Sequence, residues 1–367
     1  MPVPLSVPAA APTRLGGAER TAVTEAVARI LTDGPWVGGA PVAQFESDFA
    51  AYLGGTEVVG VANGTDALAL AFETLELPRG SGILIAANEG GYAATAARQV
   101  GLVPVVMDVD PITLAPSVDS ADAAITPAVS AIVITHLHGD AVDLAALDAW
   151  RKTRNLRLIE DCAQAAGLRV AETHVGLTGD AAAFSFYPTK NLGAMGDAGA
   201  LVFAEQTHTD RARSLAQYGW GERFRIEVPG GRNSRLDPLQ AVILSARLPF
   251  LDDRNAIRRA ISARYREALR NTGRIFGDPD TTVAHHAVAI VEHPGQLDAL
   301  LADRAIQTAR HYPYLLTEMP GLELGSSVPT PQATKLRDQS LSLPCFPEMT
   351  GAEVDHVVFA LEEWVNV

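Results

Sequence analysis

Lys190 is the residue of this chain whose type and setting are best suited to covalent chemistry. Of the 29 basic residues, only Lys152, Lys190 and Lys335 are lysines. Arginine keeps its proton in proteins, whereas a lysine amine can be desolvated, deprotonated and used as a nucleophile. Lys190 lies in a small, glycine-containing segment, and the hydroxyl of Ser185 is five residues upstream. This segment predicts an amine nucleophile beside a phosphate-binding hydroxyl; the alternative interpretation is an ordinary solvated lysine.

A second segment, Asn63-Gly64-Thr65-Asp66, follows a short apolar run and precedes a helical stretch. Gly64 allows the backbone to approach a ligand closely, and Thr65 and Asp66 present amide groups at a helix start, which favours a phosphate. The alternative is an Asn-Gly turn in which Thr65 caps the helix.

A third segment places carboxylates at the end of an apolar strand. The run 156–159 is followed by Glu160, Asp161 and, three residues later, Gln164. Open α/β sheets bind their ligands at the carboxyl ends of the strands. A carboxylate there can keep a pyridinium nitrogen protonated, which makes a pyridoxal ring a strong electron sink. Metal ligation and helix capping by Asp161 are the alternatives.

The elements that must position these segments follow a regular pattern. Apolar strands are expected at 58–62, 83–87, 103–107, 131–135 and 156–159, and helices at 66–75, 92–100 and 144–154. Continuous apolar strands separated by helices predict an α/β fold with a large, mainly parallel sheet covered by helices on both faces.

The second part of the chain predicts a smaller α+β unit. Asp237 and Pro238 are typical of a helix start, and the helix should run to about residue 270 with a kink or break at Pro249. A strand at 287–291 and helices at 297–304 and 353–364 follow. We therefore expect a large α/β domain over residues 1–250 and a small C-terminal α+β domain over 251–367.

Composition limits the classes of partner and the compartment. The 367-residue chain is 47% hydrophobic with a net charge of −14, so nucleic acid and anionic membranes are not expected partners. Two cysteines, Cys162 and Cys345, cannot build a disulfide framework. The proline-broken amino terminus lacks the basic start of a signal peptide, and no apolar run approaches the ~18 residues of a membrane span. These features predict a cytoplasmic protein.

Taken in chain order, these segments resemble the sugar aminotransferases of the DegT/DnrJ/EryC1/StrS family, which are fold-type-I pyridoxal-phosphate (PLP) enzymes. The resemblance runs from about Trp36 to Phe346. It is carried by Asn63-Gly64-Thr65-Asp66-Ala67-Leu68, by Glu160-Asp161-Cys162-Ala163-Gln164-Ala165, by Phe184-Ser185-Phe186 with Lys190-Asn191-Leu192-Gly193, and by the polar loop Asn233-Ser234-Arg235-Leu236-Asp237. That loop on its own is also compatible with a solvated surface segment.

The resemblance implies a role for each matching residue toward PLP in the large domain. Lys190 would form the covalent link to the cofactor, Asp161 would pair with the pyridine nitrogen and Gln164 would reach the ring hydroxyl. The remaining positions would bind the phosphate or the ring: Gly64, Thr65, Asp66 and Ser185 at the phosphate, Tyr92 stacked on the ring, and Asn233 reaching the phosphate from a neighbouring subunit. The implied assembly is a homodimer with shared active sites.

The chain departs from the family pattern in three places. Asn88-Glu89-Gly90-Gly91 stands where the family usually has proline and threonine ahead of the stacking aromatic. His136-Leu137-His138-Gly139 replaces the usual His-Leu-Tyr-Gly. The segment 310–316 lacks the histidine and glutamine that commonly follow it. Part of the substrate wall is therefore expected to differ.

Two other enzyme classes are not expected. His136 and His138 at alternate strand positions, with Asp140 nearby, could begin a metal site, but a catalytic site needs at least three ligands and no further metal-spaced cluster is apparent. We therefore expect no bound metal. A Rossmann dehydrogenase is not expected because no Gly-x-Gly-x-x-Gly follows the first strands.

The substrate prediction rests on two loops. Segments 217–220 and 231–237 look most like family members that act at a C-3 ketone. We thus predict amino transfer from L-glutamate to a nucleotide-linked 3-keto-deoxyhexose. A C-4 keto sugar, a cyclitol ketone and a non-catalytic PLP-binding regulator remain alternatives, although Lys190, Asp161 and Gln164 together favour catalysis over a purely binding role.

Overall fold

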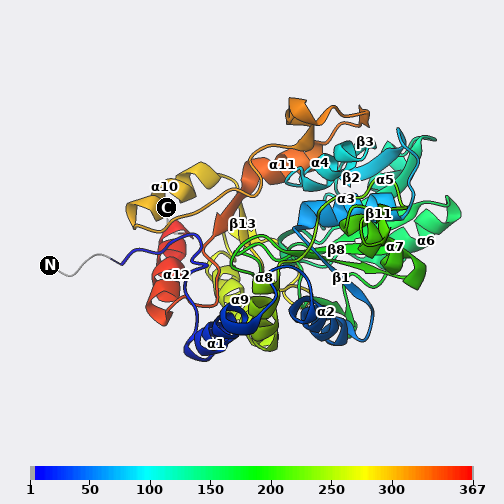
Figure 1. Cartoon of the computed structure of the whole chain (residues 1–367). Coiled ribbons are helices and arrows are strands. Elements are labelled where there is room, and N and C mark those ends of the chain that lie inside the picture. The colour runs from blue at the N-terminus through cyan, green and yellow to red at the C-terminus, as the bar shows by residue number, and fades with distance from the viewer. Residues whose placement is uncertain (1–4, 366–367) are drawn as a thin grey trace.

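The computed structural model describes residues 5–365, and its centre is an eight-stranded mixed sheet (Figure 1). Its strands, in spatial order, are β1 (Val58–Val61), β9 (Gly199–Phe203), β8 (Ala181–Ser185), β5 (Arg157–Asp161), β4 (Val129–Thr135), β2 (Gly82–Ala86), β3 (Val103–Met107) and β14 (Ser326–Ser327). Strand β9 is antiparallel to β1 and β8, and the other neighbouring pairs are parallel. The predicted mainly parallel α/β sheet is confirmed.

Helices cover both faces of this sheet. On β8, Ala181 and Ala183 belong to one buried cluster, whereas Ala182 and Phe184 belong to another, because successive side chains of a strand point to opposite faces. The first cluster is completed by α3 (Gly64–Thr74), α4 (Tyr92–Gln99), α5 (Val118–Ala124), α6 (Leu144–Thr153) and α7 (Gln206–Ala216). The second is completed mainly by α2 (Ala40–Leu53) and α8 (Pro238–Arg247).

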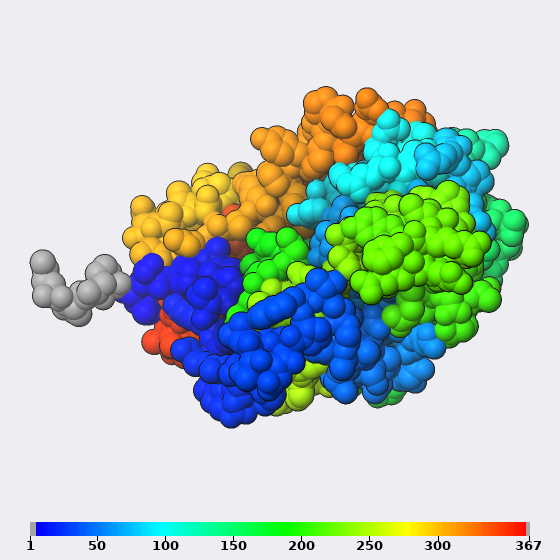
Figure 2. Space-filling model, viewed as in Figure 1, coloured from blue at the N-terminus to red at the C-terminus, as the bar shows by residue number. Residues whose placement is uncertain are grey.

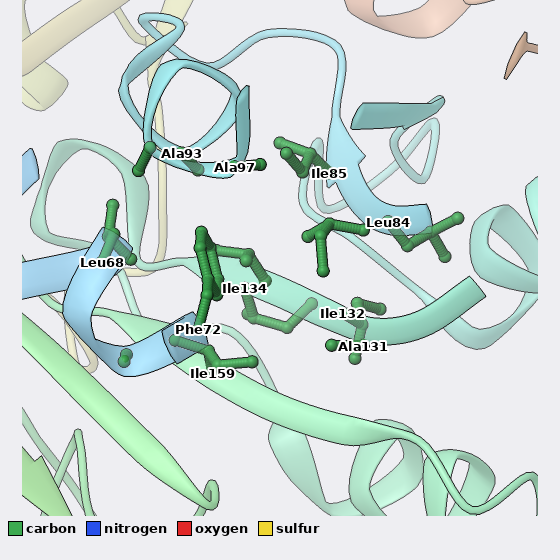
Figure 3. Close-up of a cluster of buried hydrophobic side chains, with 14 of the residues drawn as sticks. Leu68, Phe72, Leu84, Ile85, Ala93, Ala97, Ala131, Ile132, Ile134 and Ile159 are labelled. Atoms are coloured by element: carbon green, nitrogen blue, oxygen red, sulfur yellow. The ribbon is translucent and has the colours of Figure 1, made fainter. Parts of the chain in front are cut away.

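Figure 3 shows how the first cluster holds α3, the helix that begins at the Asn63-Gly64-Thr65-Asp66 segment. Leu68 and Phe72 of α3 point toward Ile134 of β4 and Ile159 of β5, and all four are at most 1% exposed. Burying a side chain of this size contributes roughly 1.5–3 kcal/mol. The start of α3 is therefore held rigidly at the edge of the sheet.

The predicted break at Pro249 is confirmed. Helix α8 ends at Arg247, a 3₁₀ turn covers Leu248–Phe250, and α9 spans Leu251–Ala268. Proline lacks an amide hydrogen and its ring clashes with the preceding turn, so the helical path changes at this point.

A second, three-stranded antiparallel sheet contains β12 (Gly273–Ile275), β13 (Ala287–Val291) and β15 (Ser340–Leu343). Its helices are α9, α10 (Pro294–Asp303), α11 (Pro331–Gln339) and α12 (Gly351–Val365). Val7 bridges to Ile306 and packs in the same cluster, so blue amino-terminal residues lie beside this unit in Figure 2. The division at residue 250 stays a prediction, because Val7 and β14 each join the other part of the chain.

The remaining elements lie at the periphery. Helix α1 (Gly17–Asp33) packs on α8, where Glu19 forms buried ion pairs with Arg247 and Arg254, both at 2.7 Å. Two small hairpins are β6 (Arg169–Val170) with β7 (Thr173–His174), and β10 (Trp220–Glu222) with β11 (Arg225–Ile226). Among the described helices, none combines the length and the apolar character that a bilayer span requires. The signal-peptide argument rests partly on residues 1–4, which lie outside the described residues.

Candidate active site

The start of α3 leaves backbone amides available to an anion. The Asn63 side chain accepts a hydrogen bond from the Asp66 amide at 2.8 Å, and the first helical bond runs from the Ala67 amide to the Asn63 carbonyl at 3.0 Å. The amides of Gly64 and Thr65 therefore have no helical acceptor and, with the helix dipole, suit a phosphate. The capping residue is Asn63, so the alternative in which Thr65 caps the helix is wrong.

Ser185 faces this helix start across the sheet edge. A Cβ atom placed on Gly64 would lie 2.7 Å from the Ser185 Cβ and 3.3 Å from its Oγ. Only glycine permits this approach, because real Cβ atoms do not come so close to a neighbouring side chain. The structure thus brings Gly64, Thr65, Asp66 and Ser185 together, and the free donors of Gly64, Thr65 and Ser185 fit a phosphate group. The Asp66 amide already donates to Asn63, so the role of Asp66 at a phosphate stays a prediction.

Lys190 lies beyond the end of β8 with its amine partly buried. Within the described chain, that amine has no hydrogen-bond or salt-bridge partner. Burial lowers the pKa of Lys190 to about 8, and the nearby negative charge of Asp161 only partly opposes this effect. A substantial fraction of the amine is therefore neutral near physiological pH, as a nucleophile or proton acceptor requires.

Asp161 is the last residue of β5 and is 5% exposed. Its Oδ1 accepts a hydrogen bond from the Ala163 amide at 3.0 Å. Burial raises the pKa of Asp161, and the Ala163 amide and the Lys190 charge work in the opposite direction. A carboxylate can accept several hydrogen bonds, so Asp161 retains the capacity to pair with a pyridine nitrogen.

Gln164 is fixed between two segments of the chain. Its Oε1 accepts from the His138 amide at 2.5 Å, and its Nε2 donates to the Tyr312 hydroxyl at 2.9 Å. Tyr312 in turn lies edge-on to Tyr92, with ring centroids 6.2 Å apart. Tyr92, at the first turn of α4, is 54% exposed, so one side of its ring is available to a ligand.

A cavity of about 250 Å³ adjoins Lys190 and is lined in part by His285, His286 and His311. The rings of His286 and His311 are stacked with centroids 3.9 Å apart. Burial and, secondarily, the Lys190 charge lower the pKa of His311 to about 4, so the His311 imidazole is neutral at physiological pH. His285 and His286 directly precede β13, which begins at Ala287, and nothing in their local sequence connects them with Lys190.

The proposed geometry of a histidine metal pair is wrong. Strand β4 ends at Thr135, and His138 lies in a 3₁₀ turn with φ 61°, so strand alternation does not reach it. His136 hydrogen-bonds to Glu160 at 3.1 Å, whereas His138 contacts His286 with its Nδ1 at 3.3 Å. The two rings do not converge on one point.

A different triad, His136, Glu160 and Cys162, has ligand atoms within 4.8 Å of one another. The Val142 amide donates to His136 Nδ1 at 3.2 Å, so Nε2 carries the ring proton and donates to Glu160. Glu160 also accepts three backbone amides, those of Gly176, Thr178 and Gly179, at 2.7–2.8 Å. The ligand atoms of His136 and Glu160 therefore already have hydrogen-bond partners, and the expectation of no metal stays a prediction.

Asn233 is exposed and lies on the loop before α8. Its Oδ1 accepts from Arg235 Nε at 2.8 Å, and its backbone pairs with Gln217. No hydrogen bond or ion pair among the described residues connects it to Lys190 or Ser185. Its role at a phosphate therefore stays a prediction that involves a second chain.

An unpartnered lysine amine, a buried carboxylate and a phosphate cradle at the carboxyl edge of this sheet define a PLP-dependent enzyme of fold type I. The chain belongs to the DegT/DnrJ/EryC1/StrS aminotransferase family, whose model matches residues 18–362. The resemblance noted in the sequence is thus confirmed, and the protein is a PLP-dependent aminotransferase.

Similarity to individual proteins extends over almost the whole chain. It is 36% identical to the dTDP-3-amino-3,4,6-trideoxy-α-D-glucose transaminase of Micromonospora megalomicea subsp. nigra, over 95% of this chain and 96% of that protein. It is 37% identical to the erythromycin biosynthesis sensory transduction protein EryC1 of Saccharopolyspora erythraea, with coverages of 94% and 95%. The crystal structure of S. venezuelae DesV superposes with a TM-score of 0.89 at 33% identity, covering 95% of each chain.

Proposed function

We propose that this enzyme transfers the amino group of L-glutamate to the C-3 ketone of a nucleotide-linked deoxyhexose. The observation that carries the proposal is the unpartnered Lys190 amine, which lies close enough to Asp161 for their charges to interact, in the same site as the phosphate cradle of α3. The C-3 position is supported by the name of the Micromonospora relative, whose amino group is at C-3, and by the loops 217–220 and 231–237.

The residues divide the work between binding and proton transfer. Bound PLP supplies an electron sink and carries the amino group between the two substrates. The helix start of α3 and Ser185 would bind the phosphate, Tyr92 would stack on the ring and Gln164 would reach its hydroxyl. Asp161 would hold a proton at the pyridine nitrogen. The Lys190 amine would accept a proton from the α-carbon of glutamate and, with the second substrate, deliver a proton to the former ketone carbon, because its pKa of about 8 allows both protonation states.

We also propose a cytoplasmic homodimer in which Asn233 acts in the partner's site. Asn233 is exposed near the β10–β11 hairpin, where Phe224 and Ile226 are 75% and 67% exposed. Large apolar side chains exposed together mark surfaces that pack against another protein. A second copy of the chain would cover them and bring Asn233 and Arg235 to a neighbouring phosphate.

Spectroscopy and turnover together test the proposed function. The purified enzyme should show a visible absorption band of covalently bound PLP that L-glutamate bleaches and a 3-keto nucleotide sugar restores. Assays with 3-keto sugars, 4-keto sugars and cyclitol ketones then identify the acceptor. Faster turnover of a 4-keto sugar or a cyclitol would replace the C-3 assignment. A band that no amine donor bleaches would indicate the non-catalytic regulator, a role to which the name of EryC1 also points.

A further inference from the structure

Three neighbouring strands of the large sheet end in a row of buried polar side chains. Strands β5, β4 and β2 are adjacent, and Asp161, Thr135 and Glu89 lie at or just beyond their carboxyl ends. Thr135 and Asp161 are directly paired in the parallel register of β4 and β5. The exposed fractions of the three residues are 5%, 8% and 4%, respectively. The row therefore begins at the residue expected to face PLP and continues across the end of β4 to the segment that follows β2.

Thr135 connects the two carboxyl groups. Its Oγ1 lies 2.8 Å from Glu89 Oε1, and it donates there when Glu89 is ionised but can accept when Glu89 carries a proton. The same hydroxyl belongs to the direct sheet neighbour of Asp161 and lowers the pKa of that carboxyl group. A threonine hydroxyl has one hydrogen to donate but can accept through its lone pairs. It can therefore serve both carboxyl groups only if one of them carries a proton.

The surroundings decide which carboxyl group is neutral. Asp161 has the Ala163 amide and the nearby Lys190 charge to stabilise an anion. Glu89 has no cationic partner among the described residues. Burial and then the charge of Asp161 raise the pKa of Glu89 well above its usual range, and the Thr135 hydroxyl and a backbone hydrogen bond at Ala86 only partly oppose this. Like charges at one buried site cannot both ionise, so the proton stays on Glu89.

Among the described groups with a shifted pKa, the Tyr312 phenol also interacts electrostatically with Glu89. Its pKa is raised by burial and, to a lesser degree, by the charges of Tyr92, Asp161 and Glu89, so it remains neutral and supplies no cation. Tyr312 packs over Gly90, where a Cβ atom would lie 2.8 Å from the Tyr312 ring. The Tyr312 phenol therefore gives Glu89 no cationic partner that would favour its ionised form.

We propose that Glu89 is a positioning residue for amino transfer: a neutral carboxyl group that donates to Thr135 and thereby directs the Thr135 hydroxyl hydrogen toward Asp161. The single negative charge of the row then stays on the carboxylate nearest the cofactor. An ionised Glu89 would instead accept the Thr135 hydrogen and remove one donor from Asp161. The inference rests on the proposed function for the role of Asp161, whereas the charge state of Glu89 can be measured without cofactor.

The first test is an infrared difference spectrum of the cofactor-free protein, recorded as wild type minus Glu89→Gln at neutral pH. We expect the loss of a carbonyl-stretch band from a neutral carboxylic acid. Asp140→Asn is the matched control, because Asp140 is also buried and its pKa is also raised by burial, but it has no hydrogen bond to Thr135 or Asp161. Loss of a carboxylate band in Glu89→Gln would overturn the proposal. Because this measurement needs neither PLP nor substrate, its outcome does not depend on whether the proposed function is correct.

The second test separates positioning from mere structural support. Glu89→Gln keeps a donor and should retain kcat within about threefold, whereas Glu89→Leu and Thr135→Val should each lower kcat about tenfold with little change in the KM for glutamate, as expected for one lost hydrogen bond to a charged group. Thr135→Ser should restore activity. Since Glu89 acts through Thr135, the double variant Glu89→Leu/Thr135→Val should be no slower than Thr135→Val alone.

Multiplicative losses in the double variant, or full activity of Glu89→Leu, would contradict the relay through Thr135. If Glu89→Leu fails to fold, the infrared result for Glu89→Gln and the paired Thr135 variants still decide the matter. The bound cofactor's absorption spectrum provides a further readout, because it reports the charge facing the pyridine ring. It should be unchanged in Glu89→Gln and Asp140→Asn and altered in Thr135→Val.

Discussion

Glu160 and Asp161 are adjacent residues of strand β5, but their carboxylates lie on opposite faces of the strand in different environments. Glu160 points to a closed side, where His136 and three backbone amides satisfy it. Despite the cost of burial, these partners lower its pKa. Asp161 points to the side of Lys190, where the Ala163 amide is its one backbone donor among the described residues, and burial raises its pKa. Two neighbouring buried carboxylates thus differ in how fully their charge is compensated.

The difference separates a structural charge from a functional one. A fully hydrogen-bonded carboxylate such as Glu160 ties three segments together and has little capacity left for a ligand. An incompletely compensated carboxylate such as Asp161 is costly in the empty protein, and a cationic ring nitrogen can offset that cost on binding. Lys190 resembles Asp161 in this respect, because its amine has no hydrogen-bond or ion-pair partner among the described residues.

The largest effect should follow from removing the Lys190 amine. Lys190→Ala should abolish turnover and the covalent cofactor band, because both proton movement and covalent attachment need that amine. Steady-state kinetics and visible absorption check this, with Lys152→Ala as the surface control, since among the described residues the exposed Lys152 amine forms an ion pair with Asp148 alone. Substantial turnover by Lys190→Ala would show that another amine is used.

The next largest effect should be that of Asp161→Asn. It should keep the fold but slow turnover about 10²–10³-fold, as does the loss of a key electrostatic stabiliser. Circular dichroism and kcat measured on the same preparation test this. If the variant stays within a few-fold of wild type, a different residue faces the pyridine nitrogen.

Replacing each of the two β5 carboxylates by its amide should change the free energy of unfolding in opposite directions. In the cofactor-free protein, Glu160→Gln should lower the free energy of unfolding by about 3 kcal/mol, because it breaks a buried hydrogen-bonded charge. Asp161→Asn should raise it by about 1 kcal/mol, because it relieves an uncompensated one. Denaturant titrations give both values. Destabilisation by both variants to the same degree would erase the distinction.

The pH dependence should sharpen the same comparison. The folded pKa of Glu160 lies below its unfolded value, so its contribution is present above the unfolded pKa near 4.5 and is lost as pH falls through the folded pKa. Asp161 has a raised pKa, so its penalty is present at neutral pH and disappears on acidification. The stability gap between wild type and Glu160→Gln should narrow below about pH 4.5. A gap that is constant with pH would contradict a charge-based origin.

The smallest expected effect comes from a subunit-mixing experiment, which tests whether Asn233 of a second chain completes the active site. Mixing inactive Lys190→Ala with inactive Asn233→Asp, whose added negative charge should repel a phosphate, should recover about a quarter of wild-type activity. After random exchange, half the dimers are mixed and one of their two sites has both intact residues. No recovery after subunit exchange has been demonstrated would place Asn233 in its own subunit's site or in none.

The sequence determined the parts that depend on local chemistry. A lysine in an arginine-rich chain, the glycine before α3 and the proline between α8 and α9 each act through their own covalent structure. Apolar strand runs alternating with helices were enough to predict the large sheet. The order of the motifs along the chain predicted the family and the residues Lys190 and Asp161 together.

The tertiary structure decided the order of the strands. It thereby also decided which buried residues lie next to Asp161. Nothing local shows that β9 inserts antiparallel between β1 and β8, or that β2, β4 and β5 are neighbours. Glu89 was noted only as a departure from a pattern, although an acid just after a buried strand was a usable signal. Its meaning comes from Thr135 and Asp161, which are 46 and 72 residues away along the chain. Pairing between distant strands depends on closing long loops and burying shared surfaces, and therefore no single segment encodes it.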